Sequence, residues 1–159
     1  MESKSQKYNC MLKQAVALME GENNLVSVLS NISALLHDSF PENFWWAGFY
    51  FVKNDELILG PFQGPVACTH IKIGRGVCGT AWKEKRTILV ADVEQFPGHI
   101  ACSTLSRSEI VVPVYVADKV WGVIDIDSTQ RSAFDGKDQA GLESLAVVLS
   151  EKIKSIPNF

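Results

Sequence analysis

The stretch Glu109–Asp127, EIVVPVYVADKVWGVIDID, decides the fold. It contains two runs rich in β-branched residues, separated by a turn expected at Asp118-Lys119. Runs of this kind on either side of a tight turn predict an antiparallel hairpin, here with strands Glu109–Ala117 and Lys119–Asp127. This hairpin sets the centre of the expected sheet.

The second strand of the hairpin has two unlike faces. Side chains alternate along a strand, so Ile124 and Ile126 share one face, and Trp121, Asp125 and Asp127 share the other. The aliphatic face belongs in the core. Carboxylates on the opposite face are costly to bury unless they are solvated or bind a ligand, so this face is either a solvated loop entry or part of a site.

The remaining chain supplies more strands and three longer helices. Strands are predicted by β-branched and aromatic runs at Trp45–Val52, Glu56–Pro61, Val66–Ile73 and Thr87–Ala91. Helices are predicted by apolar residues spaced three and four apart at Tyr8–Met19, Leu25–Leu36 and Gly136–Lys154. We therefore expect one α+β domain over residues 1–159, a six-stranded and mostly antiparallel sheet with N- and C-terminal helices packed on it.

Composition limits the class of function. The chain has 159 residues, of which 47% are hydrophobic and 21% charged, as in ordinary globular domains. A net charge of −3 without a long basic run argues against nucleic acid or an anionic membrane as a partner. The N-terminal residues do not resemble an export signal, so we expect a cytoplasmic protein whose four cysteines are kept reduced. Such cysteines are often catalytic, redox-active or metal-binding.

A glycine-rich segment follows the third predicted strand. Gly74–Gly79 contains a literal G-x-G-x-x-G and leads into a short helix. Nicotinamide and flavin sites with this motif need several βαβ units around a parallel sheet, which the rest of the pattern does not provide. The glycines instead favour a tight loop whose exposed amides can hold a carboxylate.

Three cysteines fall in or beside irregular segments. Cys68 lies in a predicted strand, Cys78 in the glycine segment and Cys102 at the end of the irregular stretch Asp92–Cys102. Inert buried thiols are one interpretation. A zinc site completed by His70 or His99 is another, although no C-x-x-C pair supports it. The fourth cysteine, Cys10, lies at the margin of the apolar stripe of the first helix and is expected only to pack.

An aromatic and acidic pocket is predicted near these cysteines. Trp46 and Tyr50 share one face of the first strand. The hairpin makes Glu109 and Asp127 neighbours, with Asp125 on the same face. Each of these residues alone is more often part of a core or a loop entry, but together with the cysteine segments they indicate a site.

These motifs together resemble the free methionine-(R)-sulfoxide reductases, which are single GAF domains. The motifs are Gly60-Pro61-Phe62-Gln63-Gly64, Ala67-Cys68, Ile73–Gly79, Phe96–Cys102, Glu109–Pro113 and Asp125–Ser128. By this resemblance Cys102 is the catalytic cysteine, Cys68 a resolving cysteine and Cys78 a second or alternative one. The resemblance also implies a substrate pocket made of Trp46, Tyr50, Glu109, Asp125 and Asp127.

The resemblance implies a thiol mechanism. Cys102 would attack the sulfoxide of free methionine-(R)-sulfoxide, with Glu109 or Asp127 as the acid, and a sulfenic acid and a disulfide would follow. Thioredoxin would reduce that disulfide, no metal, flavin or nicotinamide cofactor would be needed, and a homodimer is expected to be possible. Two alternatives stay open: a GAF module that only senses a small ligand, and a thiol-based oxidant sensor without turnover.

Overall fold

The computed structural model describes residues 1–99 and 102–157 of the chain. Its helices are α1 (Lys4–Met19), α2 (Leu25–Ser39), α3 (Gly76–Glu84) and α4 (Gly136–Ser155), with a 3₁₀ turn η1 (Val93–Gln95). Its strands are β1 (Trp46–Lys53), β2 (Glu56–Gln63), β3 (His70–Lys72), β4 (Ile88–Val90), β5 (Ser108–Val116) and β6 (Lys119–Ser128).

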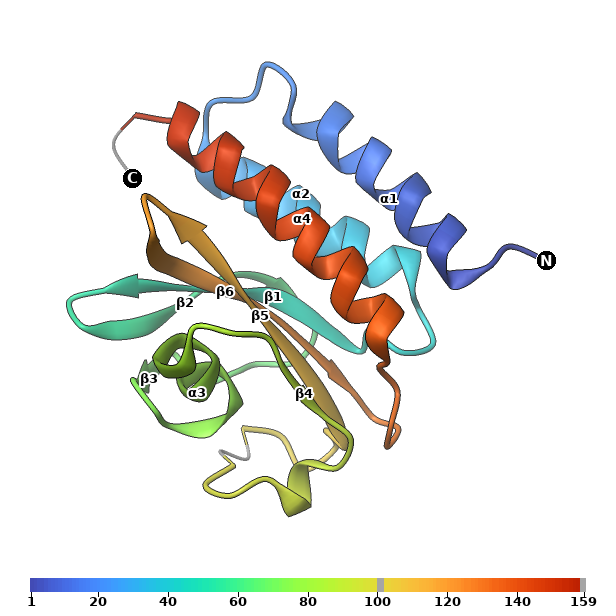
Figure 1. Ribbon diagram of the computed structural model, residues 1–159, viewed down its shortest axis with the longest axis vertical. Helices are drawn as coiled ribbons and strands as arrows, with labels where there is room; N and C mark the ends of the chain where they lie inside the picture. The colour runs from blue at the N-terminus through green and yellow to red at the C-terminus, as the bar shows by residue number, and fades with distance from the viewer. Residues whose placement is uncertain (100–101, 158–159) are drawn as a thin grey trace.

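The strands form one sheet in the order β3-β2-β1-β6-β5-β4, and every pair is antiparallel. Helices α1, α2 and α4 lie on one side of this sheet, and α3 lies on the other with the irregular segments around it (Figure 1). This arrangement confirms the predicted α+β fold. Among the described helices, none is both long and apolar enough to cross a membrane.

Local signals set the ends of the helices. Asn24 caps α2 by accepting a hydrogen bond from the Ser27 amide, as predicted. Asp135 and Asp138 form a reciprocal capping box at the start of α4, also as predicted. Helix α1 begins earlier than expected, at Lys4, because Ser3 forms another capping box there.

Helix α1 packs on the other two helices of its layer, whereas α2 lies directly on β1 and β2. The ring of Tyr8 lies so close to α4 that a Cβ at Gly141 would be 2.3 Å from it. The Tyr8 hydroxyl also donates to Asp138 at 2.7 Å. Glycine at position 141 therefore lets α1 approach α4 closely.

The β5–β6 turn differs by one residue from the prediction. It is formed by Ala117 and Asp118, which both have positive φ, and not by Asp118-Lys119. The left-handed conformation at two successive turn residues matches the twist of a two-residue hairpin. A plain hairpin with this turn would place Glu109 opposite Ile126, on the helix side of the sheet.

A β-bulge restores the expected register. The ladder steps on β6 from Val120 to Gly122, so Trp121 is the extra residue, and beyond the bulge Glu109 pairs with Asp127. The prediction that Glu109 and Asp127 are neighbours is thus confirmed. The predicted side of Trp121 is wrong, because the bulge redirects this side chain to the helix-side cluster.

The segment before β3 is irregular, so the predicted strand Val66–Ile73 is wrong over most of its length. Strand β3 covers only His70–Lys72, and Cys68 precedes it. The carbonyl oxygens of Pro65 and Cys68 accept hydrogen bonds from side chains of β1 instead of from a neighbouring strand.

Candidate active site

The acidic and aromatic residues come from three neighbouring strands. Asp127 on β6 pairs with Trp46 on β1 and with Glu109 on β5, so the three lie in one row across the sheet. Asp125 and Tyr50 follow on the same face, because strand residues two and four apart point the same way. The row faces away from the layer of α1, α2 and α4.

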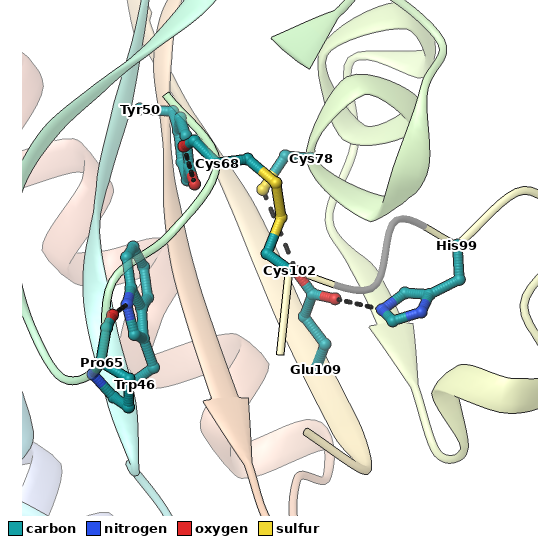
Figure 2. The surroundings of a disulfide bond; sticks show 8 residues. All are labelled: Trp46, Tyr50, Pro65, Cys68, Cys78, His99, Cys102 and Glu109. Carbon is teal, nitrogen blue, oxygen red and sulfur yellow. Dashed lines mark hydrogen bonds and ion pairs between the residues drawn. A yellow bond between two sulfur atoms is a disulfide. The ribbon is translucent and has the colours of Figure 1, made fainter. Parts of the chain in front are cut away.

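A cavity on this face brings most of the predicted residues together. Its lining includes Trp46, Tyr50, Cys78, Cys102, Glu109, Asp125 and Asp127. Cys68 joins this group through a disulfide bond with Cys102, whose Cα atoms lie 5.8 Å apart (Figure 2). Folding therefore assembles side chains that are widely separated in the sequence around one small space.

The cysteines differ in their surroundings. Cys102 is exposed at the rim, whereas Cys78 is buried on α3 with its Sγ 4.0 Å from Glu109 Oε1. Burial and the nearby carboxylates raise the pKa of Cys78 well above its usual value. The thiol of Cys78 is thus held in its neutral form. Cys10 lies exposed on α1, away from the cavity lining.

The carboxyl groups cannot all ionise cheaply. Burial raises the pKa of Glu109 and of Asp127 well above the usual range, and Asp125 adds repulsion to both. Burial also raises the pKa of Asp125, but hydrogen bonds from Glu109 and Cys78 oppose that effect. Near neutral pH the cluster therefore holds at least one proton.

One oxygen of this cluster lacks a hydrogen bond. Asp125 is only 5% exposed, and no described residue bonds to its Oδ1. A buried carboxylate oxygen without a donor is costly, so this atom favours a ligand that brings its own N–H group.

Sequence reasoning missed two polar residues that contact the carboxyls of the cavity. Ser106 is buried and donates from Oγ to Asp127 Oδ1 at 2.8 Å. His99 lies with Nε2 3.8 Å from Glu109 Oε2, and burial lowers its pKa. The sequence suggests His99 only as a possible zinc ligand. Both contacts depend on the path of the irregular chain after η1, for which the sequence carries no periodic signal.

The segment that contains these residues is described in part. Of the predicted motif Phe96–Cys102, Ile100 and Ala101 lie outside the described residues. On either side of that gap, His99 and Cys102 both line the cavity.

Comparison with known proteins agrees with this arrangement. Residues 23–153 match the family model of the GAF domain. The chain is 43% identical over 157 residues to the free methionine-R-sulfoxide reductase of Escherichia coli strain K12, covering 99% of this chain and 94% of that protein. It is also 50% identical over 148 residues to GAF domain-containing protein A of Dictyostelium discoideum, covering 92% of each.

A solved structure is similar over nearly the whole chain. It is the free methionine-R-sulfoxide reductase of Neisseria meningitidis in complex with its substrate, with a TM-score of 0.93 and 44% identity. The match covers 97% of this chain and 92% of the other. The chain belongs to the GAF domain family, in the branch of the free methionine-R-sulfoxide reductases.

The glycine segment of this GAF domain forms the wall of the cavity opposite the strands. Gly76, Val77 and Cys78 make up the first turn of α3 and line the cavity. Amides of a first helical turn have no acceptor within the helix, and Arg75 provides no side-chain cap. The wall therefore presents N–H groups and the positive end of a helix to an anion.

The structure does not support the zinc site considered from the sequence, in which His70 or His99 would complete a set of cysteine ligands. Cys68 and Cys102 are joined to each other, and His70 is exposed and contacts Glu56 at 3.0 Å. Among the described residues, Cys78, Glu109 and Asp125 offer one sulfur and two oxygens within 4.8 Å of one another. Because burial favours the neutral forms of Cys78 and Glu109, a metal would have to displace their protons.

Proposed function

We propose that this chain reduces free methionine-(R)-sulfoxide to methionine by thiol chemistry. The observation that carries the proposal is the Cys68–Cys102 disulfide at the rim of a cavity lined by buried carboxyls and aromatic rings. A cysteine pair supplies the two electrons of the reduction, and the cavity supplies groups for a small zwitterion. The relatives named free methionine-R-sulfoxide reductase support the same substrate.

The substrate would be held by its charged ends. Its ammonium group would donate to Asp125, whose Oδ1 has no other donor among the described residues. Its carboxylate would accept hydrogen bonds from the amides at the start of α3. Its methyl group would lie on the indole of Trp46, and the ring of Tyr50 would complete the apolar wall. A pocket that pairs both charges favours the free amino acid over the same residue in a peptide chain.

Reduction would begin at Cys102. Its thiolate attacks the sulfoxide sulfur and forms an S–S bond to it, while a protonated carboxyl, Glu109 or Asp127, donates its proton to the sulfoxide oxygen. That oxygen is then transferred as a hydroxyl group to the Cys102 sulfur, and the S–O and S–S bonds to the substrate sulfur break. Methionine leaves with two electrons more than the sulfoxide had, and Cys102 becomes a sulfenic acid. The raised pKa values of both carboxyls support this role, because they keep a proton available near neutral pH.

Resolution would join Cys102 to Cys68. The Cys68 sulfur attacks the sulfenic sulfur, the S–S bond forms, and the hydroxyl leaves as water after taking up a proton. The observed pairing supports Cys68 for this step, and the raised pKa of the buried Cys78 makes it the weaker competitor. Cys78 would then act as a second or alternative thiol.

An external dithiol of the thioredoxin class would return the enzyme to its reduced form. The exposed position of Cys102 supports this, because an incoming thiolate can reach its sulfur. A reducing compartment such as the cytoplasm would supply this reductant. A homodimer remains part of the proposal as an expected assembly.

The decisive assay measures methionine. Reduced protein is mixed with free L-methionine-(R)-sulfoxide and either dithiothreitol or thioredoxin with its reductase. We expect turnover of the free (R) epimer, and much slower turnover of the (S) epimer or of methionine sulfoxide within a peptide. Binding without methionine formation would indicate a sensory GAF module. A disulfide that forms with peroxide but not with the sulfoxide would indicate an oxidant sensor.

A further inference from the structure

The segment that carries Cys68 is fastened to the centre of the sheet by two side chains of β1. Trp46 donates from Nε1 to the carbonyl oxygen of Pro65 at 2.9 Å, and Tyr50 donates from Oη to the carbonyl oxygen of Cys68 at 2.8 Å (Figure 2). The amide of Leu59 donates to the carbonyl of Thr69, just after the cysteine. The segment thus lacks a regular ladder but is held at several points.

Both side-chain donors are rigid. Trp46 is 4% exposed and Tyr50 is 2% exposed, and their rings stack 6.1 Å apart. Trp46 also stacks on Phe62 at 5.0 Å, and β1 is paired on both sides. Buried and stacked rings keep one rotamer, so the two donor atoms have fixed positions.

Gly64 lets the start of the segment lie directly against the indole of Trp46. Its φ is +139°, which side chains rarely tolerate, and an added Cβ would lie 2.6 Å from Trp46 Cδ1. The chain therefore passes directly over the ring of Trp46 before it reaches Pro65. The indole is a support for the segment as well as a wall of the cavity.

The hydroxyl of Tyr50 is committed to this contact. A phenol has one hydrogen to donate, and here the acceptor is the backbone of Cys68 itself. Burial raises the pKa of Tyr50, so the proton stays on the oxygen. The hydroxyl therefore has no second hydrogen to donate to a ligand in the cavity.

We propose that Trp46 and Tyr50 are positioning residues for the disulfide, which hold the backbone of Cys68 where its sulfur meets that of Cys102. A disulfide forms only within narrow Cα and Cβ distances, so fixing one partner raises the effective concentration of the other. This inference goes beyond the substrate contacts given to the two residues above. It rests on the proposed function only in taking the Cys68–Cys102 bond to be reversible.

The test measures the thiol–disulfide equilibrium without methionine sulfoxide. The full chain is equilibrated in dithiothreitol redox buffers, and the Cys68–Cys102 bond is quantified after acid quenching and alkylation. In Tyr50→Phe we expect the equilibrium constant for oxidation to fall about two- to tenfold, the equivalent of one lost hydrogen bond. Trp46→Phe, which lacks the indole N–H, is expected to shift it in the same direction.

Tyr115→Phe is the matched control. The Tyr115 hydroxyl also donates to a backbone carbonyl, that of Lys85, outside the cavity lining. We expect its redox equilibrium to equal that of the wild type. A merely structural role for Tyr50 would lower the unfolding free energy of the dithiol and disulfide forms alike and leave the equilibrium constant unchanged, as urea titrations of both forms can show.

Two results would overturn the inference. One is an unchanged equilibrium constant in folded Tyr50→Phe and Trp46→Phe. The other is an equal shift in Tyr115→Phe. Because no substrate is present, neither result depends on whether the protein turns over methionine sulfoxide. Conversely, a wild type that forms the disulfide reversibly but makes no methionine would reject the proposed function and leave the positioning role intact.

Discussion

The two faces of the sheet differ in what they bury. The face under α1, α2 and α4 packs a continuous apolar cluster that includes Ile124 and Ile126 of β6. The opposite face of the same strand buries Asp125 beside Glu109 and Cys78. Successive residues of β6 thus pack in the apolar core on one side of the sheet and line the proposed active site on the other. We therefore expect substitutions on the helix side of β6 to lower stability, and substitutions on its cavity side to lower turnover.

The largest effect is expected from Cys102→Ser, at the rim of the cavity. Serine is a far weaker nucleophile at this position, so turnover of methionine sulfoxide should fall by at least about a thousandfold. The free energy of unfolding of the reduced protein should stay within about 0.5 kcal/mol of the wild type, because Cys102 is exposed. Methionine release and urea unfolding measure the two quantities.

Cys10→Ser is the matched control for that variant. Cys10 is also exposed but lies on α1, outside the cavity lining. Its turnover should equal that of the wild type. Comparable losses in both variants would mean that the activity does not depend on the cavity face.

The second largest effect tests the other face. Ile126 has no exposed surface and lies between the two aspartates in sequence. Ile126→Ala should lower the free energy of unfolding by about 2–5 kcal/mol, because it leaves a cavity in the helix-side cluster. Turnover per folded molecule should change little, as the side chain points away from the site. A variant that kept its stability but lost turnover would contradict the division between the faces.

Much of this division could be predicted from the sequence, because alternation along a strand is a local property. Ile124, Ile126, Asp125 and Asp127 lie on the predicted faces of β6. The expected pairing of Glu109 with Asp127 also holds. The faces follow from period-two alternation, whereas the pairing also depends on the bulge, because the turn alone would place Glu109 opposite Ile126.

What could not be predicted depends on contacts between distant segments. The bulge at Trp121 sets the final register, and no composition signal marks it. The segment before β3 has β-branched residues but gives its carbonyls to side chains of β1. Ser106 and His99 reach the carboxyls only because of the irregular chain between β4 and β5. The pairing of Cys68 with Cys102 was implied by the family resemblance and not by spacing.

A smaller effect is expected from Glu109→Gln, which removes one of the two candidate acids. We expect a loss of turnover of about a hundredfold, in the range of general acid catalysis. Glu42→Gln, at an exposed glutamate ahead of β1, is the control and should retain full turnover. An unchanged rate in Glu109→Gln would assign the proton donation to Asp127.

The same variant should change how stability depends on pH. The folded pKa of Glu109 is raised above its usual value, so the folded state binds its proton more tightly than the unfolded state does. Wild-type stability should therefore fall as the pH rises above the ordinary carboxyl range, by up to about 1.4 kcal/mol per pH unit for one such group. Urea titrations from pH 5 to 8 should show that the free energy of unfolding falls less steeply with pH in Glu109→Gln than in the wild type. An equal or steeper fall would mean that a group other than Glu109 has the raised pKa.

The smallest effect is expected from Ser106→Ala, which changes the environment of one carboxyl without removing it. The Ser106 hydroxyl donates to Asp127 and lowers the pKa of that group against the effects of burial and of Asp125. Its loss should raise the pKa of Asp127 further, by less than about one pH unit for one hydrogen bond. If Asp127 must ionise or donate a proton during turnover, the pH–rate profile of methionine formation should shift to higher pH by a similar amount. Ser103→Ala is the control, because Ser103 also lines the cavity but its Oγ accepts a hydrogen bond from the Leu105 amide. An unshifted profile in Ser106→Ala would leave Glu109 as the group that governs the pH dependence.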